Sequence, residues 1–180
     1  ACCPRGDHHG GWGYLLQAMR EIPVGGDGLV ALVDDEDYEL VSGFSWIVMR
    51  RPKGILYARS RYRDDMSNVR EQRMHGLITG WPETDHVNLD GLDNRRENLR
   101  QADRSQNCAN RRKPTHGVTS RFKGVYWNPI NRIWVASIMV HKRGIYLGRY
   151  PSEIEAAAAY DVAAVKYFGE FARPNLVQSA

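Results

Sequence analysis

Side chains suited to chemistry are concentrated in one stretch near the middle of the chain, TDHVNLDGLDNRRENLRQADRSQN. Within it Asp85 and His86 are adjacent, and Asn98 and Asn107 follow at intervals of twelve and nine residues, with arginines between them. Carboxylate and amide oxygens are hard ligands that favour Mg²⁺ or Mn²⁺ over zinc. A neutral imidazole can take a proton from water, and arginine can hold phosphate. Such a set could hydrolyse a phosphodiester with the help of one metal ion.

The elements that must position these residues are a strand, a long loop, a second strand and a helix. The composition predicts the end of a strand at Thr84–Val87 and a short returning strand at Leu99–Ala102. Asp103 is a good N-cap for a helix over RSQNCANRR. Neighbouring residues on a regular strand point to opposite faces, so Asp85 and His86 can share a site only if the strand bends there or the substrate wraps its end.

The region before this stretch, residues 20–80, predicts a small α+β module. Acidic residues at the start of DDEDYELVSGF suit the N-terminus of a short helix, which Gly43 would end. Runs rich in β-branched and aromatic residues predict strands, and a further run predicts one or two helical turns. The strands are expected at Leu29–Val33, Trp46–Met49 and Ile55–Ser60, and the turns within Arg73–Ile78.

The region after it carries three β-rich runs, FKGVYW, IWVASIMV and GIYLGRY, separated by turn residues. This pattern predicts an antiparallel meander. Ser152, with Glu155 three residues later, forms a capping box that opens a helix, and Gly169 is its expected end. Apolar residues recur along this helix at helical spacing, and we expect core positions at Ile154, Val162 and Phe168.

Positive charge is concentrated in the second half of the chain. The net charge is only +4 and the pI about 9.1. Between Asn94 and Arg149, however, 13 Lys and Arg stand against two acids. Such a distribution suits a polyanion, although a solvated basic face would give the same balance.

Three cysteines, Cys2, Cys3 and Cys108, make no disulfide framework, which indicates a reducing compartment. No apolar run approaches the roughly 18 residues of a membrane span. The N-terminal sequence lacks the charge and apolar order of a secretory signal.

Residues 1–18 are expected to be an unassigned leader ahead of a natural start at Met19. Cys2 and Cys3, with His8 and His9, could bind zinc in principle. Their spacing matches no established zinc site.

DHVNLDGLDNRRENLR followed by SQNCANR resembles the His-Asn-His (HNH) nuclease family, in the form found in phage free-standing and intron-encoded homing endonucleases. IPVGGDGLVALVDDEDYELVSGFSW and RMHGLI resemble the region that precedes the motif in those proteins, so the likeness covers about residues 20–112. The resemblance implies a ββα-metal module with one Mg²⁺ or Mn²⁺ ion. In it His86 would be the general base, Asp85 and Asn107 the metal ligands, and Asn98 the residue that braces the loop and orients His86.

The chain departs from the motif's name in its last position, which is Asn107 in place of histidine. An amide is a weaker ligand, so we expect low metal affinity until DNA contributes its own oxygens. His75 is a family-typical position for which we expect a structural role.

Residues 121–175 resemble the Apetala-two/ethylene-response-factor (AP2/ERF) DNA-binding domain, through FKGVYW, WVASI, IYLGRY and SEIEAAAAYDVAAVKYFGEFARPN. This domain is known from plant transcription factors and also occurs behind HNH nucleases in phages. The resemblance implies a three-stranded sheet in the major groove with a helix packed behind it. For Trp134, core packing is an alternative. The positions at or near DNA would be Lys123, Tyr126, Trp127, Arg132, Trp134, Ser137, Met139 and Tyr146, with phosphate contacts from Arg121, Lys142, Arg143 and Arg149.

These patterns together predict an α+β protein of two modules. DNA contacts in the first half are expected from Arg95, Arg96, Arg111, Arg112 and Lys113, the last three following the backbone between two footprints. A tethered DNA-binding module would raise the local concentration of the cutting module at its site. The expected divisions are a leader (1–18), an HNH nuclease domain (19–112), a basic linker (113–120) and an AP2/ERF-like domain (121–176).

The predicted function is that of a metal-dependent endonuclease that nicks or cleaves double-stranded DNA at a preferred site, as a homing enzyme does. We expect double-stranded DNA as partner, no membrane and no protein partner, a monomer or weak dimer, and a cytoplasmic location, in the bacterial host if the protein is phage-encoded. The alternative is a sequence-specific DNA-binding regulator that does not cut.

Overall fold

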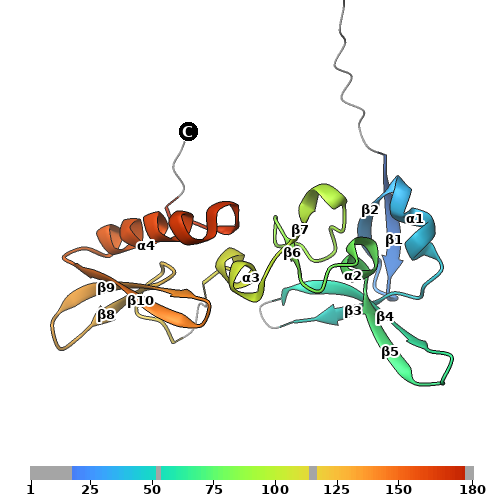
Figure 1. Ribbon diagram of the computed structural model, residues 1–180, viewed down its shortest axis with the longest axis horizontal. Helices are drawn as coiled ribbons and strands as arrows, with labels where there is room; N and C mark the ends of the chain where they lie inside the picture. Colours follow the sequence, from blue (N-terminus) through green and yellow to red (C-terminus); the bar gives the residue numbers. More distant parts are fainter. Residues whose placement is uncertain (1–17, 52–53, 114–116, 177–180) are drawn as a thin grey trace, which may run out of the picture.

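The protein has a mixed α+β fold built from several small antiparallel sheets. Figure 1 shows its computed structural model, which describes residues 18–51, 54–113 and 117–176. The described residues contain two two-stranded and two three-stranded sheets. Within them, no helix is both long and apolar enough to cross a membrane. The leader with Cys2, Cys3, His8 and His9 lies outside the described residues apart from position 18.

The first half combines a hairpin with a three-stranded sheet. Its elements are β1 (Met19–Val24), β2 (Leu29–Asp34), α1 (Asp35–Ser42), β3 (Ile47–Arg50), β4 (Leu56–Arg63), β5 (Val69–Arg73) and α2 (Met74–Thr79). β1 pairs with β2, and β4 lies between β3 and β5. Val24, Val33 and Met74 are fully buried in the shared core. The expected strands and the helix ended by Gly43 are present, whereas β1 and β5 were not expected.

The middle segment consists of two short strands, a long loop and a helix. In chain order these are β6 (Thr84–His86), the 3₁₀ turn η2 (Arg96–Asn98), β7 (Leu99–Gln101) and α3 (Arg104–Asn110). β6 and β7 are antiparallel, with Asp85 opposite Arg100. The carboxylate of Asp103 accepts from the Gln106 amide, and the Gln106 side chain accepts from the Asp103 amide, so a capping box starts α3. The predicted order of strand, loop, strand and helix is therefore present.

The last segment is a three-stranded sheet covered on one face by a long helix (Figure 1). Its elements are β8 (Val125–Asn128), β9 (Ile133–Val140), β10 (Arg143–Tyr150), α4 (Glu153–Phe168) and the 3₁₀ turn η3 (Gly169–Phe171). The sheet order is β10-β9-β8, the predicted meander. Gly124, just before β8, has φ +72° and lies so close to the Tyr160 ring and the Ser137 carbonyl that a Cβ would collide with both. Glycine is therefore required where this sheet meets α4.

The buried face of α4 differs from the one expected. Ile154 and Val162 are 56% and 72% exposed, and of the three expected core positions only Phe168 is buried. The side that faces the sheet carries mainly small residues, which let the helix axis approach the strands closely. The larger aliphatic side chains are thereby turned outward. The buried residues of α4 are Ala156, Ala157, Tyr160, Ala163, Ala164 and Phe168.

The two halves of the protein meet in a common apolar cluster. Ala102, just after β7, and Ala109 of α3 are buried together with residues of the C-terminal segment. Figure 1 shows α3 between β6–β7 and the C-terminal sheet. Lys113, expected in a linker that follows DNA, donates instead to the carbonyls of Phe122 and Val125. The basic linker along DNA stays a prediction, and the two halves that it joins are packed on each other. The C-terminal members of the cluster are Ile138, Tyr160, Ala163, Ala164, Phe168 and Phe171.

Candidate functional site

Asp85 lies in the middle of β6 with only 3% of its surface exposed. Its register partner Arg100 donates from Nε and Nη2 to Oδ2, at 3.0 and 2.8 Å. From the other side, Nδ2 of Asn110 on α3 lies 3.2 Å from Oδ1 and 3.0 Å from Oδ2. The carboxylate is thus held between a guanidinium group and a helix-borne amide.

The amide of Asn110 is surrounded by more acceptors than it has protons. In addition to the two oxygens of Asp85, the carbonyls of His86 and Val87 lie 2.9 and 3.5 Å from Nδ2, and an amide NH₂ group offers only two protons. Carboxylate and carbonyl oxygens gathered in this way are the ligand type that Mg²⁺ and Mn²⁺ prefer. Rotating the amide by half a turn would add its own oxygen to the group. The oxygen atoms around Asp85 are therefore of the type that binds a hard divalent cation. Such a cation would compete with the Arg100 guanidinium group for Oδ2 of Asp85.

A cation at this place would depend on a single carboxylate. In the part of the chain that the structure describes, no group of three or more His, Cys, Asp and Glu side chains could hold a metal ion. The remaining ligands would have to be amide and carbonyl oxygens, or oxygens of the substrate.

His86 follows Asp85 directly, yet it contacts a different set of residues. It is 4% exposed, its Nε2 lies 3.4 Å from Oδ1 of Asn94, and its ring centroid lies 5.0 Å from that of His75 and 5.6 Å from that of Tyr57. Burial lowers the pKa of His86, and the Asn94 contact and the Asp85 charge partly oppose this shift. The imidazole is therefore in the neutral form that can accept a proton, but it is covered from solvent.

Asn98 spans the loop between the two short strands. Its Nδ2 donates to the Asp93 carbonyl at 2.7 Å, and its Oδ1 accepts from the Asn88 amide at 3.0 Å. The loop is therefore braced by Asn98 in the way we expected. The side chain in hydrogen-bond contact with His86, however, is Asn94, which is fully buried. A catalytic role of Asn98 stays a prediction.

The first half of the protein fastens this loop in place. Gly91 lies against the Leu56 carbonyl and the Tyr57 ring, with no room for a Cβ. Arg96 donates from its amide to Asp34 at 2.7 Å and from its guanidinium to Asp37 at 2.8 and 2.6 Å. The acidic DDED segment thus serves to hold the loop that carries the motif.

Asn107 lies one helical turn before Asn110, at the edge of a cleft of about 830 Å³. Its Nδ2 donates to the Thr84 carbonyl at 3.3 Å. The structure thus joins Asp85 to Asn110 and places Asn107 beside Thr84. A shared metal site of Asp85 and Asn107 stays a prediction.

The imidazole that lines this cleft is that of His75 on α2. Burial lowers its pKa to about 3, and the neighbouring His86 and Arg73 add to the shift. His75 also packs edge-on against Tyr57, with ring centroids 5.6 Å apart. It therefore separates the cleft from His86, which agrees with a structural role.

Four of the side chains expected to contact DNA are engaged within the protein instead. Arg95 pairs with Asp93 and Glu97, each at 2.8 Å, and Arg96 and Lys113 make the contacts given above. The ammonium group of Lys123 donates to the carbonyls of Ala109 and Arg111 at the end of α3. Burial lowers the pKa of Lys123 to about 8. A role of these four residues in DNA contact stays a prediction, and in this structure each group neutralises or caps another part of the fold.

Several of the remaining expected contacts lie on the C-terminal sheet. Tyr126, Met139 and Tyr146 are exposed there, whereas Trp127 and Trp134 are half-buried with ring centroids 5.1 Å apart. Trp134 also packs against the apolar cluster beneath α4, in line with its alternative role in the core. Ser137 is half-buried. The exposed basic groups are Arg111, Arg112, Arg121, Arg132, Lys142, Arg143 and Arg149.

Three residues of the site were not foreseen, namely Arg100, Asn94 and Asn110. For two of them a signal existed. Arg100 is the residue that an antiparallel pairing of the two predicted strands can place opposite Asp85, and Asn110 follows Asn107 at a spacing of three, on the same side of the predicted helix.

Comparison with known proteins agrees with both halves of this picture. Residues 120–170 match the AP2 domain family. An AP2/ERF and B3 domain-containing protein of Oryza sativa subsp. japonica is 44% identical over 62 residues, which are 34% of this chain and 17% of that protein. A second protein of this description from the same organism is 42% identical over 62 residues, 34% of this chain and 19% of its own length. The chain therefore covers less than a fifth of either rice protein.

An uncharacterized HNH endonuclease of Acanthamoeba polyphaga mimivirus is 29% identical over 160 residues, which are 84% of this chain and 78% of that protein. Unlike the rice proteins, it matches the chain across both halves. Residues 120–170 are therefore an AP2 domain, and the chain as a whole is a distant relative of an HNH endonuclease.

Proposed function

We propose that the protein is a DNA endonuclease in which β6, β7 and α3 cleave a phosphodiester while the AP2 domain binds the duplex. The observation that carries this proposal is the likeness to an HNH endonuclease over 84% of the chain. The AP2 domain supports DNA as the substrate. One such site per chain suits a nick, and a double-strand break requires two copies. A preferred target, as a homing enzyme has, is part of the proposal.

The chemistry is shared between β6 and α3. Asp85 and an amide of α3, either Asn107 or Asn110, would hold Mg²⁺ or Mn²⁺, and such an ion, when bound, supplies positive charge at the scissile phosphate. The neutral His86 accepts a proton from the attacking water at a ring nitrogen. Because His75 and Tyr57 cover this ring, they have to shift before water can reach it.

A second candidate function is DNA binding without cleavage. It is favoured by the contacts of Asp85, whose oxygens are already bound by Arg100 and Asn110, and by the burial of His86. Under this alternative the middle segment would serve only as a structural support for the AP2 domain.

Relaxation of supercoiled plasmid DNA in Mg²⁺ or Mn²⁺ separates the two functions. The wild type should nick the plasmid, His86→Ala should lose this activity, and His141→Ala, which changes an exposed histidine, should keep it. Equal nicking by the wild type and His86→Ala would remove His86 from the mechanism. Intact plasmid after long incubation with tightly binding wild type would favour the second function.

A further inference from the structure

The cleft beside Asn107 is lined by arginines from two separate parts of the fold. Arg51, just after β3, and Arg73, the last residue of β5, line it from the sheet. Arg104, the first residue of α3, and Arg111, just after α3, line it from the opposite part of the fold. We call these four the cleft arginines. Arg104 and Asn107 are three residues apart and share one side of α3, and Arg111 follows as the C-cap of that helix.

Most other arginines of this half pair with a carboxylate, whereas the cleft arginines have no internal counter-charge. Arg95, Arg96 and Arg100 all form ion pairs with carboxylates, but over the described ranges no salt bridge is found for any cleft arginine. Two acids, Glu71 and Glu83, also line the cleft. Glu71 is itself bound by Arg59 at 2.6 Å, so an excess of positive charge remains.

Three of the cleft arginines, Arg51, Arg73 and Arg111, lie close enough to Tyr57 for their charges to act on it. The phenol of Tyr57 lines the cleft, and burial raises its pKa while the charges of Arg111, Arg73 and Arg51 oppose the rise. His75, which contacts His86, lines the same cleft. Arginines from both walls therefore line the same cleft as the imidazole that covers the proposed base.

We propose that this cleft binds the sugar-phosphate backbone of one DNA strand, with the cleft arginines as its phosphate ligands. This inference rests on the proposed function and names where the substrate of that site lies. Guanidinium groups bind phosphate oxygens in a bidentate manner. Ligand pockets of about 300–1,000 Å³ hold a drug-sized molecule, so a cleft of about 830 Å³ has room for a short piece of one strand and not for a duplex. Trp81, also in the lining, offers a ring on which a base can stack.

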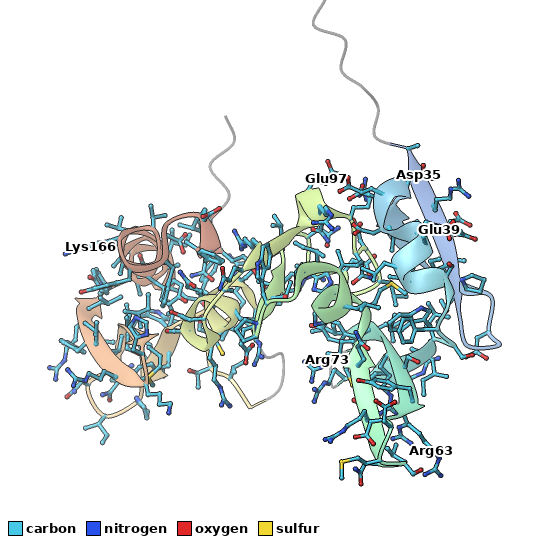
Figure 2. The ribbon with its side chains drawn as sticks, turned by 45° about the vertical axis from the view of Figure 1, so that its right-hand side comes forward. Asp35, Glu39, Arg63, Arg73, Glu97 and Lys166 are labelled. Carbon is cyan, nitrogen blue, oxygen red and sulfur yellow. The ribbon has the colours of Figure 1, made fainter. Side chains whose placement is uncertain are left out.

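The test measures how the affinity of the full chain for a fluorescent oligothymidylate depends on salt, without a divalent metal. Each phosphate contact to a single strand contributes about 0.7 to the slope of log affinity against log salt. Arg73→Gln/Arg104→Gln, which changes one residue on each wall, should therefore reduce the slope by about 1.4. Arg63→Gln is the matched control, because Arg63 lies at the far end of the same hairpin from Arg73 (Figure 2). It should leave the slope unchanged.

Two further variants separate charge from folding. Arg73→Lys/Arg104→Lys keeps both charges and should restore most of the slope. If the glutamine pair lowers the thermal midpoint, Arg51→Gln/Arg111→Gln tests the same cleft with the other two arginines. If both double glutamine variants fold and show the same salt dependence of affinity as the wild type, the proposal is overturned, even if the wild type nicks plasmid DNA. A reduced slope in a protein that nicks nothing would uphold the cleft and reject the nuclease function.

Discussion

Two buried regions of this protein are built from opposite kinds of side chain. Beneath α4 the core is apolar and largely alanine, whereas around β6 and β7 many of the buried residues are charged or amide side chains. A buried polar group adds little net stability and is costly when it lacks a partner. The α4 region therefore shows what folding alone needs, and the excess polarity around β6 indicates a use beyond stability. Its members are Asp85, His86, Asp93, Asn94, Asn98 and Asn110.

Among the substitutions that test this difference between the two regions, Arg100→Ala is expected to lower the free energy of unfolding most. The change leaves the carboxylate of Asp85 buried without its guanidinium partner, and breaking a buried ion pair costs about 3–5 kcal/mol. Denaturant unfolding should show this loss. Adding Asp85→Asn should recover part of it, since no buried charge then remains.

Arg20→Ala is the matched control for Arg100→Ala. Arg20 pairs with Asp35 on the surface, where both side chains are about half exposed, so its loss should cost less than about 1 kcal/mol. If both substitutions lowered the free energy of unfolding by the same amount, the buried ion pair would contribute no more to stability than the surface pair.

The next largest effect is expected from Asp85→Asn on cleavage. The side chain keeps its size but loses its charge, so single-turnover nicking should fall by about 100-fold or more. Affinity for duplex DNA should stay near that of the wild type, because the AP2 domain is unchanged. A parallel loss of binding and nicking would show that the polar region supports the AP2 domain and does not cut.

Two alanine substitutions on α3 separate structure from chemistry. Asn110→Ala removes the amide that contacts Asp85 and two backbone carbonyls, and it should cost about 1–3 kcal/mol of stability. Asn107→Ala, at the cleft edge, should cost less than about 1 kcal/mol. The nicking rates of the two variants, measured under conditions in which each is fully folded, show which amide acts at the site. Full activity in both would exclude an α3 amide as a ligand.

The last prediction concerns the pH dependence of stability and His75. Its pKa is about 3 in the folded protein against 6.5 as the ordinary value, so the unfolded chain binds the proton more strongly. The contribution of His75 is therefore fully present above pH 6.5 and is lost as the pH falls, by about 1.4 kcal/mol for each unit. Unfolding free energies measured from neutral to mildly acidic pH should fall less steeply in His75→Phe than in the wild type. His141→Gln should show the same dependence of unfolding free energy on pH as the wild type. If His75→Phe also showed the wild-type dependence, His75 would not be a buried neutral imidazole.

Local signals in the sequence were sufficient for most of the elements. Asp103 with its capping box, Gly43 and Gly169 mark helix ends through contacts a few residues long. β5 was missed because VREQR is polar and lies at the edge of its sheet, and β1 because Pro23 is atypical of strands. The wrong face of α4 has a different cause, since its alanines and its aliphatic residues both recur at helical spacing.

The sequence predicted which types of residue form the candidate site, but it did not predict which of these side chains contact one another. Asp85, His86 and the amides could be chosen by chemistry. Which amide meets Asp85 depends on the angle at which α3 packs, which spacing does not determine. The partners of Arg96 could not be found either, because Asp34 lies 62 residues away in the chain. An arginine held by a distant carboxylate and one that is free for phosphate look the same in a sequence.

The apolar cluster that joins α3 to the C-terminal segment has a geometric consequence. Ala102 and Ala109 are buried with Phe168 and Phe171, so neither half can swivel without opening that cluster. If the protein is a nuclease as proposed, this rigid packing fixes the distance between the sequence bound by the AP2 domain and the bond that is cleaved. The number of base pairs between them should therefore be constant. Lengthening the chain between Lys113 and Gly117 would leave that offset unchanged, whereas a bulky residue at Ala109 would scatter it.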